Sequence, residues 1–587
     1  MKQKKTNGGT IVQKSHKSST ILYIHSLIYV KNNISKLLYN IKIIKALVQI
    51  DITYDNQYLV CNSDYPYELQ LLKNFLTREI SNAWLLKKKM PYINTERCFM
   101  NEYGMVPVGL WLEVLQFCKQ FNISANLTEN TTNYINQFQL DYQAFHIYID
   151  DMFKDAKMPI YDTDNEIEGY KAFKPYEYQI KAAYTLLKYR KACGEISTSA
   201  GKTLISFMIF KYLIDMGVKK ILYIVPSVDL ATQSAEKYEL YESYLAKHKH
   251  NWEIGILHAG LKKAEKEKVE SCNILFGTFQ SLNKRDVEFF KDFGAVIGDE
   301  CHHFSAESLK NTMNKCNNLR YAIGVTGTFP KPTTIENIEI QSYIGPVVYK
   351  LTSDQLINEE HAATPIYIVF QIMNWGTRDE KRQLYYNRVQ KANNEDDMQL
   401  GNKLLKQEQE FVNNSYTRLK FIGDLAIKMA KNTLIIFGDV KGGYGKKVAD
   451  YIKDNSDKNV YYVDGTTPTE NREYYKKCMA EDENGKTIIV GSIGTFGEGI
   501  DVPNIESIFL VNSAKSDRMI RQVVGRGLRN ASGKEKCILY DFVDDLRYSE
   551  DKKKRYYDNY MWAHYKTRKG IYPEQHFPTY EQKYDFK

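Results

Sequence analysis

The stretch STSAGKT, residues 197–203, follows a short strand-like segment and opens the apolar helix-forming run LISFMIFKYLI. A bound phosphate chain needs converging backbone N–H groups at a helix N-terminus, a lysine that reaches the β- and γ-phosphates, and a hydroxyl for Mg²⁺. Gly201, Lys202 and Thr203 supply these groups, although Ile196 replaces the first glycine of the usual G-x-x-x-x-G-K-T pattern. The stretch predicts a phosphate-binding loop in an α/β fold, and an ordinary strand-to-helix turn is the alternative.

Apolar strand-like runs alternate with helical segments after this loop, in two series. The first series comprises ILYIVP (221–226), ILFGTF (274–279), AVIGDE (295–300) and AIGVTGT (322–328), and the second comprises TLIIFGD (433–439), TIIVGSIGTFG (487–497) and SIFLVN (507–512). Such alternation is typical of a parallel sheet flanked by helices. The sequence therefore predicts two parallel-sheet α/β domains in tandem. They are candidates for structural duplicates, although no sequence repeat is evident.

The segments outside these two series have other patterns. The N-terminus is basic and rich in Gly, Ser and Thr, and cannot bury enough apolar surface to become ordered. Further on, Leu110, Val114, Phe117 and Phe121 recur at helical spacing. We therefore expect a poorly ordered basic tail at 1–45, a small α+β accessory domain at 46–150, a first α/β domain at 151–345, a second at 346–550 with a helical insertion at about 376–430, and a basic aromatic extension at 551–587.

The composition limits the classes of protein that fit. With 587 residues, 43% of them hydrophobic and 26% charged, the chain is an ordinary water-soluble protein too long for one hydrophobic core. The net charge of +9 is compatible with a polyanionic partner but does not require one. No C-x-x-C pair occurs among the nine cysteines, and the apolar run Ile21–Val30 is too short to span a membrane. We expect a cytoplasmic protein without disulfides, structural metal or a membrane partner.

A second motif lies at the end of an apolar run, in AVIGDECHHF (295–304). In an open α/β fold the carboxyl ends of parallel strands form the edge where ligands bind. At that edge Asp299 can hold Mg²⁺, and Glu300 can orient and deprotonate an attacking water. Two exposed carboxylates at a strand end are a common alternative. Together with Lys202, however, the pair indicates a P-loop ATPase.

Further segments narrow this broad class, because in their order they resemble the motifs of superfamily-two helicases. They are PYEYQ (175–179), IVPSVDLATQ (224–233), GTFQSL (277–282), DECH (299–302), VTGT (325–328), TFGEGIDVP (495–503) and RQVVGRGLR (521–529). The last segment fits the pattern Q-x-x-G-R-x-x-R at Gln522, Gly525, Arg526 and Arg529. The resemblance implies two RecA-like domains that bind ATP and Mg²⁺ and act on a nucleic acid.

The residues and the resemblance together give a set of candidate roles. The candidate catalytic residues are Lys202, Glu300, Gln522, Arg526 and Arg529, and the candidate nucleotide-binding residues are Gln179, Ser199, Ala200, Gly201, Lys202, Thr203, Gly499 and Asp501. Thr203 and Asp299 are the candidate Mg²⁺ ligands. We expect His302, Thr326 and Thr328 to couple nucleotide state to domain position, and Pro226, Thr278, Gln280 and Thr495 to contact nucleic acid. Of these, Gln179 would read the adenine.

The two arginines also have a physical argument of their own. Negative charge on the γ-phosphate in the transition state is stabilised by guanidinium groups supplied across a domain interface. Arg526 and Arg529 are spaced one helical turn apart, so both can reach the same group. An isolated R-x-x-R is more often a solvated helix face, but the ordered series of motifs argues against that interpretation here.

From about Val48 onward the chain resembles the phage UvsW family of DNA helicases. The N-terminal part of this resemblance lies in NEYGMVPVGLWLEVLQFCKQFN (101–122), which is similar to the family's accessory domain. The resemblance to this family implies a motor that acts on branched or duplex DNA and on RNA–DNA hybrids during replication, recombination and repair. We expect the motor to be a monomer. The accessory domain, with Lys87, Lys88 and Lys89, is then a candidate DNA-binding element.

Three other functions remain open at this stage. They are an RNA helicase, a translocase subunit of a restriction system, and a nucleic-acid binder without catalysis. The basic aromatic stretch 552–569 is able to stack on nucleic acid, but it also fits a surface helix with buried aromatics. Asp162, Glu168 and Lys171 have the wrong spacing for a convincing nuclease site, so we interpret them as part of a solvated linker.

Overall fold

The computed structural model describes residues 49–586 apart from short gaps. These gaps are 56–57, 82, 137–138, 162–166, 198, 250–251, 259, 304–305, 359–363, 394–397, 439–441, 483, 498–503, 512, 530–533 and 551–557. Several predictions concern residues outside the described part, namely the tail at 1–45, the run Ile21–Val30, and the candidate residues Asp162, Gly499 and Asp501. The chain divides into two compact units, one formed by Met1–Gln139 with Pro332–Ser342 and the other by Leu140–Lys331 with Tyr343–Lys587.

The N-terminal unit is a small α+β fold, as expected. Its four-stranded sheet has the order β5-β2-β1-β6 and consists of β1 (Gln49–Asp55), β2 (Tyr58–Asn62), β5 (Met105–Pro107) and β6 (Ser124–Leu127). Helix α4 (Trp111–Phe121) buries Val114 and Phe117 in the core of this unit, while Phe121 at its end stays partly exposed. Ile335 and Ile338, which come much later in the chain, complete the same core.

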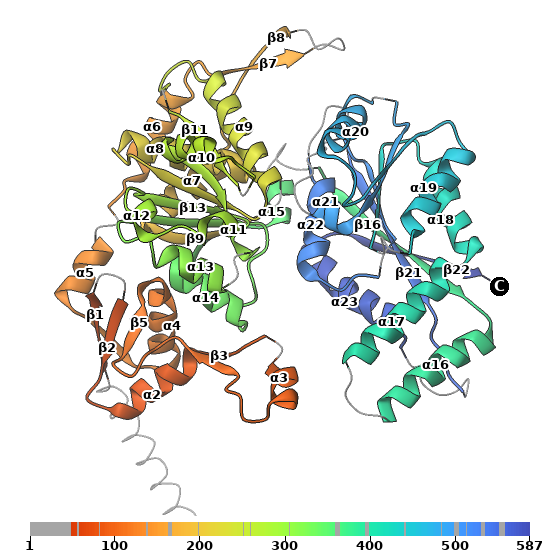
Figure 1. The fold of residues 1–587 in the computed structure, drawn as a ribbon, viewed down its shortest axis with the longest axis horizontal. Helices are drawn as coiled ribbons and strands as arrows, with labels where there is room; N and C mark the ends of the chain where they lie inside the picture. The colour runs from red at the N-terminus through yellow and green to blue at the C-terminus, as the bar shows by residue number, and fades with distance from the viewer. Residues whose placement is uncertain are drawn as a thin grey trace, which may run out of the picture. The chain divides into compact units, whose positions relative to one another are not determined.

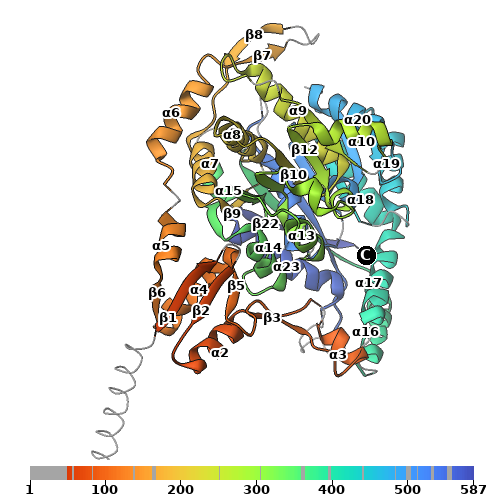
Figure 2. The same ribbon diagram turned by 60° about the vertical axis from the view of Figure 1, so that its left-hand side comes forward.

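Helices and a small arm surround this sheet. The helices are α2 (Pro66–Phe75) and α5 (Glu129–Asn136), and α14 (Ile335–Ile344) contributes Ile335 and Ile338 to the core. The arm contains β3 (Thr77–Glu79), α3 (Ala83–Lys89) and β4 (Glu96–Cys98). Both Figure 1 and Figure 2 show α3 standing apart from the four-stranded sheet at the end of β3.

The first α/β sheet is built from seven parallel strands in the order β11-β12-β10-β13-β14-β9-β15. The strands are β9 (Lys191–Ile196), β10 (Ile221–Val225), β11 (Ile254–Leu257), β12 (Ile274–Thr278), β13 (Ala295–Asp299), β14 (Tyr321–Thr326) and β15 (Val347–Leu351). Strands β10, β12 and β13 are buried along their whole length, as expected for a sheet that helices cover on both faces (Figure 1). Because β14 lies between β13 and β9, the loops that follow these three strands meet at one edge.

Nine helices of the described residues surround the first sheet, and the first of them begins before residue 151, the predicted start of this domain. They are α6 (Tyr142–Met152), α7 (Glu177–Tyr189), α8 (Lys202–Asp215), α9 (Val228–Tyr244), α10 (Lys263–Ser271), α11 (Phe279–Leu282), α12 (Val287–Phe290), α13 (Ala306–Met313) and α15 (Ser353–Asn358). Phe145 and Ile149 of α6 lie in the core that contains the first sheet. The hairpin of β7 (Lys157–Tyr161) and β8 (Ile167–Ala172) projects from this sheet (Figure 2).

The second α/β sheet also has seven parallel strands, in the order β18-β19-β17-β20-β21-β16-β22. They are β16 (Ile366–Trp375), β17 (Thr433–Phe437), β18 (Asn459–Val463), β19 (Thr487–Ser492), β20 (Ser507–Leu510), β21 (Cys537–Asp545) and β22 (Thr579–Phe586). Helices α18 (Tyr416–Lys428), α19 (Tyr444–Asp454), α20 (Thr469–Glu481), α21 (Ile493–Gly497) and α22 (Asp517–Gly527) connect the strands. The prediction of two parallel-sheet domains in tandem is confirmed.

The helical insertion and the C-terminal extension both attach to the second sheet. The insertion follows β16 and contains α16 (Arg378–Asn393) and α17 (Met398–Asn413). The extension forms α23 (Tyr560–Glu574), which buries Tyr565 and Tyr572, and β22, which pairs with β16. Of the two interpretations of the basic aromatic stretch, the structure therefore shows the one with buried aromatics. Among the described residues, no helix is long and apolar enough to cross a membrane.

Candidate ATP-hydrolysis site

The loop predicted to bind phosphate leads from β9 into the first turn of α8. Gly201 has φ +76°, the left-handed conformation that glycine adopts without strain, and the backbone N–H groups of Leu204 and Ile205 bond to its carbonyl. A Cβ added at Gly201 would lie 2.3 Å from Nε2 of Gln179, so any side chain here would displace that amide as well as strain the backbone. Lys202 is the first residue of α8 and Thr203 the second. The candidate phosphate ligands therefore lie at a helix N-terminus.

Gln179 has structural contacts that the sequence analysis missed. The side chain is 4% exposed, its Nε2 donates to the carbonyl of Ala200 at 2.9 Å, and its Oε1 accepts from the N–H of Tyr176 at 2.9 Å. The amide thus fixes the phosphate loop to the start of α7. A signal for the second contact exists in the sequence, because a Gln three residues after a helix N-cap often bonds back to the cap. The adenine-reading role stays a prediction.

The two acidic residues lie at the end of β13, beside the loop. The N–H of Glu300 bonds to Oδ1 of Asp299 at 2.9 Å, and Glu300 has φ +46°, a conformation that is strained for any residue except glycine. Nζ of Lys202 lies 3.4 Å from Oε1 of Glu300. The structure therefore brings the phosphate-loop lysine and the acidic pair together, as expected from the strand order.

The pKa values of the two carboxyl groups shift in opposite directions. Burial and the neighbouring charge of Glu300 raise the pKa of Asp299. Burial would also raise the pKa of Glu300, but the positive charge of Lys202 and the nearby His302 outweigh it and lower that pKa. The chain thus holds Glu300 ionised beside Lys202. A divalent cation bound to Asp299 would favour its ionised form instead.

The candidate coupling residues form a hydrogen-bonded group with Glu300. Oγ1 of Thr326 donates to Oε2 of Glu300 at 3.2 Å and accepts from the N–H of Thr328 at 3.1 Å. Nδ1 of His302 also contacts Thr326, and lies 3.3 Å from Oε2 of Glu300. The threonine motif and the DECH motif are therefore joined through one hydroxyl. That this junction couples nucleotide state to movement stays a prediction.

Of the candidate arginines of the second domain, Arg526 lies in the last turn of α22 and Arg529 follows the end of that helix. Within the same compact unit, Oγ of Ser199 donates to the carbonyl of Gly525 at 2.8 Å, so the phosphate loop touches this helix directly. Burial lowers the pKa of Arg526 and of Arg529 to about 10, so both guanidinium groups stay cationic at neutral pH. Gln522 lies one turn earlier on α22 and is half-buried.

Lys237 of α9 is a further cation at this edge that the sequence motifs did not single out. Burial, together with the positive charges of Arg529 and Lys202, lowers its pKa to about 8, while the carboxylate of Asp299 acts in the opposite direction. Lys237 is therefore close enough to Lys202, Arg529 and Asp299 for their charges to shift its pKa, and it adds positive charge to their surroundings. No motif or spacing in the sequence marks this residue, because α9 brings it to the site through the fold alone.

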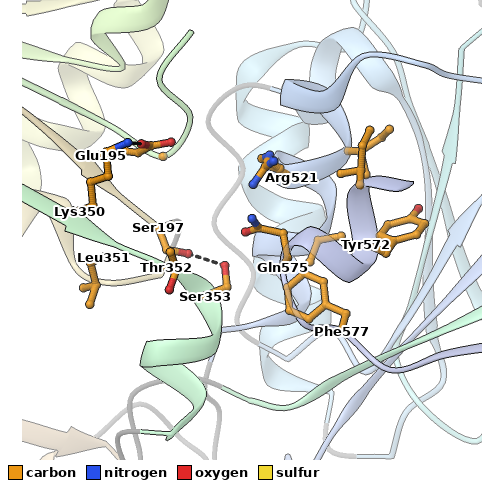
Figure 3. Close-up of a pocket in the computed structure, with 14 residues that line it drawn as sticks. Glu195, Ser197, Lys350, Leu351, Thr352, Ser353, Arg521, Tyr572, Gln575 and Phe577 are labelled. Atoms are coloured by element: carbon orange, nitrogen blue, oxygen red, sulfur yellow. Dashed lines mark hydrogen bonds and ion pairs between the residues drawn. The ribbon is translucent and has the colours of Figure 1, made fainter. Parts of the chain in front are cut away.

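A cavity of about 180 Å³ lies beside the first residue of the phosphate loop (Figure 3). On one side Oγ of Ser197 and Oγ of Ser353 are 2.7 Å apart. On the other side the lining comes from α22 and α23, including Arg521 and Gln575. The C-terminal extension therefore contributes to the lining near the phosphate loop.

The four candidate nucleic-acid contacts lie at the carboxyl ends of strands. Pro226 follows β10, Thr278 ends β12, and Gln280 is exposed on α11. Oγ1 of Thr278 is 2.9 Å from Oγ of Ser281, and in the second sheet Oγ1 of Thr495 is 2.7 Å from Oγ of Ser492. Their contacts with nucleic acid stay predictions. The described residues hold no cluster of His, Cys, Asp or Glu suited to a further metal ion.

Comparisons with known proteins agree with this geometry. Residues 172–331 match the family described as type III restriction enzyme, res subunit, and residues 417–531 match the helicase conserved C-terminal domain. The ATP-dependent DNA helicase uvsW of Enterobacteria phage T4 is 28% identical over 518 residues, which cover 86% of this chain and 93% of that protein. The DNA 3'-5' translocase XPB2 of Sulfurisphaera tokodaii is 21% identical over 62% of this chain and 81% of its own length.

The crystal structure of T4 UvsW aligns with a TM-score of 0.43 and 24% identity, covering 92% of this chain and all of that one. The sequence comparisons, the two matched helicase regions and the tandem RecA-like sheets lead to the same class of protein. The chain is an ATP-dependent helicase of the superfamily-two type that resembles UvsW over most of its length.

Proposed function

We propose that this helicase uses ATP to act on branched DNA or RNA–DNA hybrids, by unwinding or branch migration, in phage-type replication, recombination and repair. The observation that carries this proposal is the extent of the similarity to the T4 helicase, which covers 86% of this chain. A match of that extent includes more than the motor sheets alone. The proposal adds that the chain works as a monomer in the cytoplasm of a bacterium or of a phage-infected host.

The residues at the edge of the first sheet fit the binding of Mg²⁺ and ATP. Thr203 and Asp299 would supply a hydroxyl and a carboxylate, the hard oxygen ligands that Mg²⁺ prefers. Bound there, Mg²⁺ would neutralise phosphate charge. Lys202 binds the β- and γ-phosphates from the start of α8. Glu300, which its lowered pKa keeps ionised, orients the attacking water and accepts its proton.

The second sheet supplies the positive charge that this reaction needs. Arg526 and Arg529 stabilise the charge that develops on the γ-phosphate, and Gln522 helps to orient the reacting groups. Support comes from the contact between Ser199 and Gly525, because it brings α22 to the phosphate loop. Burial of the two guanidinium groups strengthens their electrostatic effect, since little water screens them.

Hydrolysis must also change the grip on the nucleic acid. The hydroxyl of Thr326 bonds to Glu300, so a change in the charge of Glu300 is felt by Thr328 and His302. We propose that this group transmits the state of the nucleotide, and that Pro226, Thr278, Gln280 and Thr495 contact the nucleic acid. Contacts of this kind read the sugar-phosphate backbone and carry no base specificity.

A comparison of nucleic-acid substrates tests the proposal. ATP hydrolysis and strand separation are measured with single-stranded DNA, duplex DNA, a DNA fork, an RNA–DNA fork and an RNA duplex, at one salt concentration because binding depends steeply on salt. We expect the largest activity with the branched substrates. An RNA duplex that stimulates both activities more than any DNA would contradict the proposal and favour an RNA helicase.

A translocase subunit of a restriction system is a second candidate, because residues 172–331 match a family named for such a subunit. Movement along duplex DNA does not require that its strands separate, so this candidate and the first one differ in a measurable way. Displacement of a third strand from a DNA triplex, without unwinding of any fork, would support this candidate. Unwinding of forks by the purified chain alone would exclude it.

A further inference from the structure

The arm of the N-terminal unit, residues 77–98, is fixed at its base. Strands β3 and β4 pair from Thr77 opposite Cys98 to Glu79 opposite Glu96, and the N–H of Ile80 bonds to the carbonyl of Thr95 at 2.8 Å. Arg97 forms an ion pair with Glu339 of α14, which belongs to the same unit. Backbone pairing and an ion pair thus hold the base of the arm. Helix α3 therefore projects from a base of defined structure.

The tip of the arm exposes large apolar side chains. Trp84 is 50% exposed, Met90 is 52% exposed and Tyr92 is fully exposed. Ala83 at the start of α3 is buried, whereas its neighbour Trp84 is half exposed, so the helix packs at its start and still presents an aromatic ring to solvent. Apolar surface of this kind, gathered on a fixed projection, is typical of a binding site.

The arm is also strongly basic. Its 22 residues include five Lys or Arg and two Glu, a formal net charge of +3, whereas the whole chain of 587 residues carries +9. Lys87 is bonded to Glu79 at 2.8 Å and remains half exposed, and Lys88 beside it is exposed. A polyanion is therefore the partner whose charge complements this surface.

We infer that the arm is the part of the accessory unit that recognises a branch point, with Lys87 and Lys88 on the phosphate backbone and Trp84 and Tyr92 stacked on unpaired bases. This inference rests on the proposed function. In a continuous duplex the faces of the bases are covered by their neighbours, whereas at a branch point unpaired bases expose a face on which an aromatic ring can stack. The aromatic side chains then provide preference for branches, while the lysines hold any nucleic acid.

The full chain is used for the test, with point variants of exposed side chains. The first variant is Trp84→Ala with Tyr92→Ala, and the second is Lys87→Gln with Lys88→Gln. The matched control replaces Tyr67 and Tyr103 by Ala, because these are exposed tyrosines of the same unit outside the arm. An unchanged melting temperature shows that each variant folds.

We expect the aromatic variant to bind and unwind a DNA fork at least about tenfold less well. A decrease of this size is typical when an aromatic ring that stacks on a base is removed. Its ATP hydrolysis with single-stranded DNA stays within about twofold of wild type, as do all activities of the tyrosine control. The lysine variant loses affinity for both forks and duplexes, and the slope of log affinity against log salt becomes shallower by about two.

A fork with abasic sites at the branch point identifies what the aromatic rings contact. The abasic fork should lower binding and unwinding by wild type by the same factor by which the aromatic substitutions lower them on the intact fork. For the aromatic variant, the abasic fork should cause no further decrease. If the aromatic variant handles intact forks as wild type does, the inference is wrong, whatever other partner the arm has. If wild type itself does not process forks, the proposed function fails first.

Discussion

The two α/β sheets of this helicase have the same connectivity but hold charge in different ways. When the seven strands of either sheet are taken in chain order, they lie at the sixth, third, first, second, fourth, fifth and seventh positions across that sheet. At the second position, β12 and β19 even end in the same feature, a pair of hydroxyls three residues apart at Thr278 and Ser281 and at Ser492 and Thr495. The sheets are thus structural duplicates without an evident sequence repeat.

Their carboxyl edges differ where the chemistry lies. In the first sheet β9 leads into the phosphate loop and β13 ends in Asp299 and Glu300. In the second sheet the strand equivalent to β9 is β16, which leads into the helical insertion, and β20, equivalent to β13, is followed by VNSAKS without an acidic residue. A shared topology therefore provides the same edge twice, and side chains decide which edge can hold a nucleotide.

Buried arginines of the second sheet show the same contrast within one domain. Arg568 of α23 forms two bonds to Asp541 at 2.7 and 2.8 Å, and Arg418 of α18 forms two to Asp544 at 2.9 Å. Despite burial, these carboxylates raise the pKa of both arginines, whereas burial lowers the pKa of Arg526 and its neighbour Arg529. We interpret the first pair of arginines as architectural and the second as poised for phosphate.

The largest effect is expected for Lys202→Ala. Because the proposed role of this lysine is to bind the γ-phosphate, where charge develops in the transition state, ATP hydrolysis should fall at least about 10³-fold. The melting temperature should change far less than hydrolysis, since the Lys202 side chain is paired with Glu300 at the start of α8 and is not part of the apolar core. A matched control is Lys350→Ala, an exposed lysine of the same sheet paired with Glu195. Near-normal hydrolysis by the Lys202 variant would exclude this loop as the site.

The variant Arg568→Met should damage stability rather than chemistry. It leaves Asp541 as a buried carboxylate without its bidentate partner, which typically costs about 3–5 kcal/mol. Arg568 also donates to the carbonyl of Ala514 at 2.7 Å, just before α22, so the start of that helix should loosen. Chemical denaturation measures the loss. The double variant with Asp541→Leu should recover part of it, and failure of any loss to appear would refute the architectural interpretation.

The variant Arg526→Ala should do the opposite. Its charge is needed most in the transition state, so kcat for ATP hydrolysis should fall about 10²–10³-fold while KM changes little. Arg529→Ala should behave alike, because Arg529 follows the last turn of α22, which carries Arg526, and burial lowers its pKa as well. Denaturation should show a far smaller loss than for Arg568→Met. A variant whose only defect is a raised KM would contradict the proposed role of Arg526.

The variant Glu300→Gln should bind ATP but hydrolyse it about 10²-fold more slowly, through loss of the general base. Binding is measured with a fluorescent nucleotide and hydrolysis by release of phosphate. The amide keeps the size of the side chain and one oxygen for the bond from Thr326. Asp299→Asn is the informative companion, since it should weaken binding of the magnesium nucleotide instead. Weak binding by the Glu300 variant, with normal turnover of what is bound, would reverse the two roles.

The sequence allowed the edge of the first sheet to be predicted because its residues are local to strand ends. A strand followed by STSAGKT or by DECH has its polar residues placed by the strand itself. The contacts of Arg568 were not predictable in this way, because Asp541 lies on a different element and no spacing relates the two. The same holds for Lys237, which α9 carries to the site, and for Ile335, which packs in the N-terminal unit. Long-range packing decides these positions.

The smallest effect is expected for Gln179→Ala, and its pattern separates two roles. If Gln179 mainly holds the phosphate loop through the carbonyl of Ala200, loss of this bond, worth on the order of 1 kcal/mol, should raise KM about fivefold for ATP and GTP alike. If it also reads the adenine, the variant should lose preference for ATP over GTP. Gln179→Glu retains the acceptor for the N–H of Tyr176 but not the donor to Ala200, so it isolates the loop contact. We expect Gln179→Ala to show both losses. When ATP binds, the side-chain amide of Gln179 would leave the carbonyl of Ala200 and bond to the adenine, which would link adenine binding to the shape of the loop. Unchanged KM values for both nucleotides would contradict both roles.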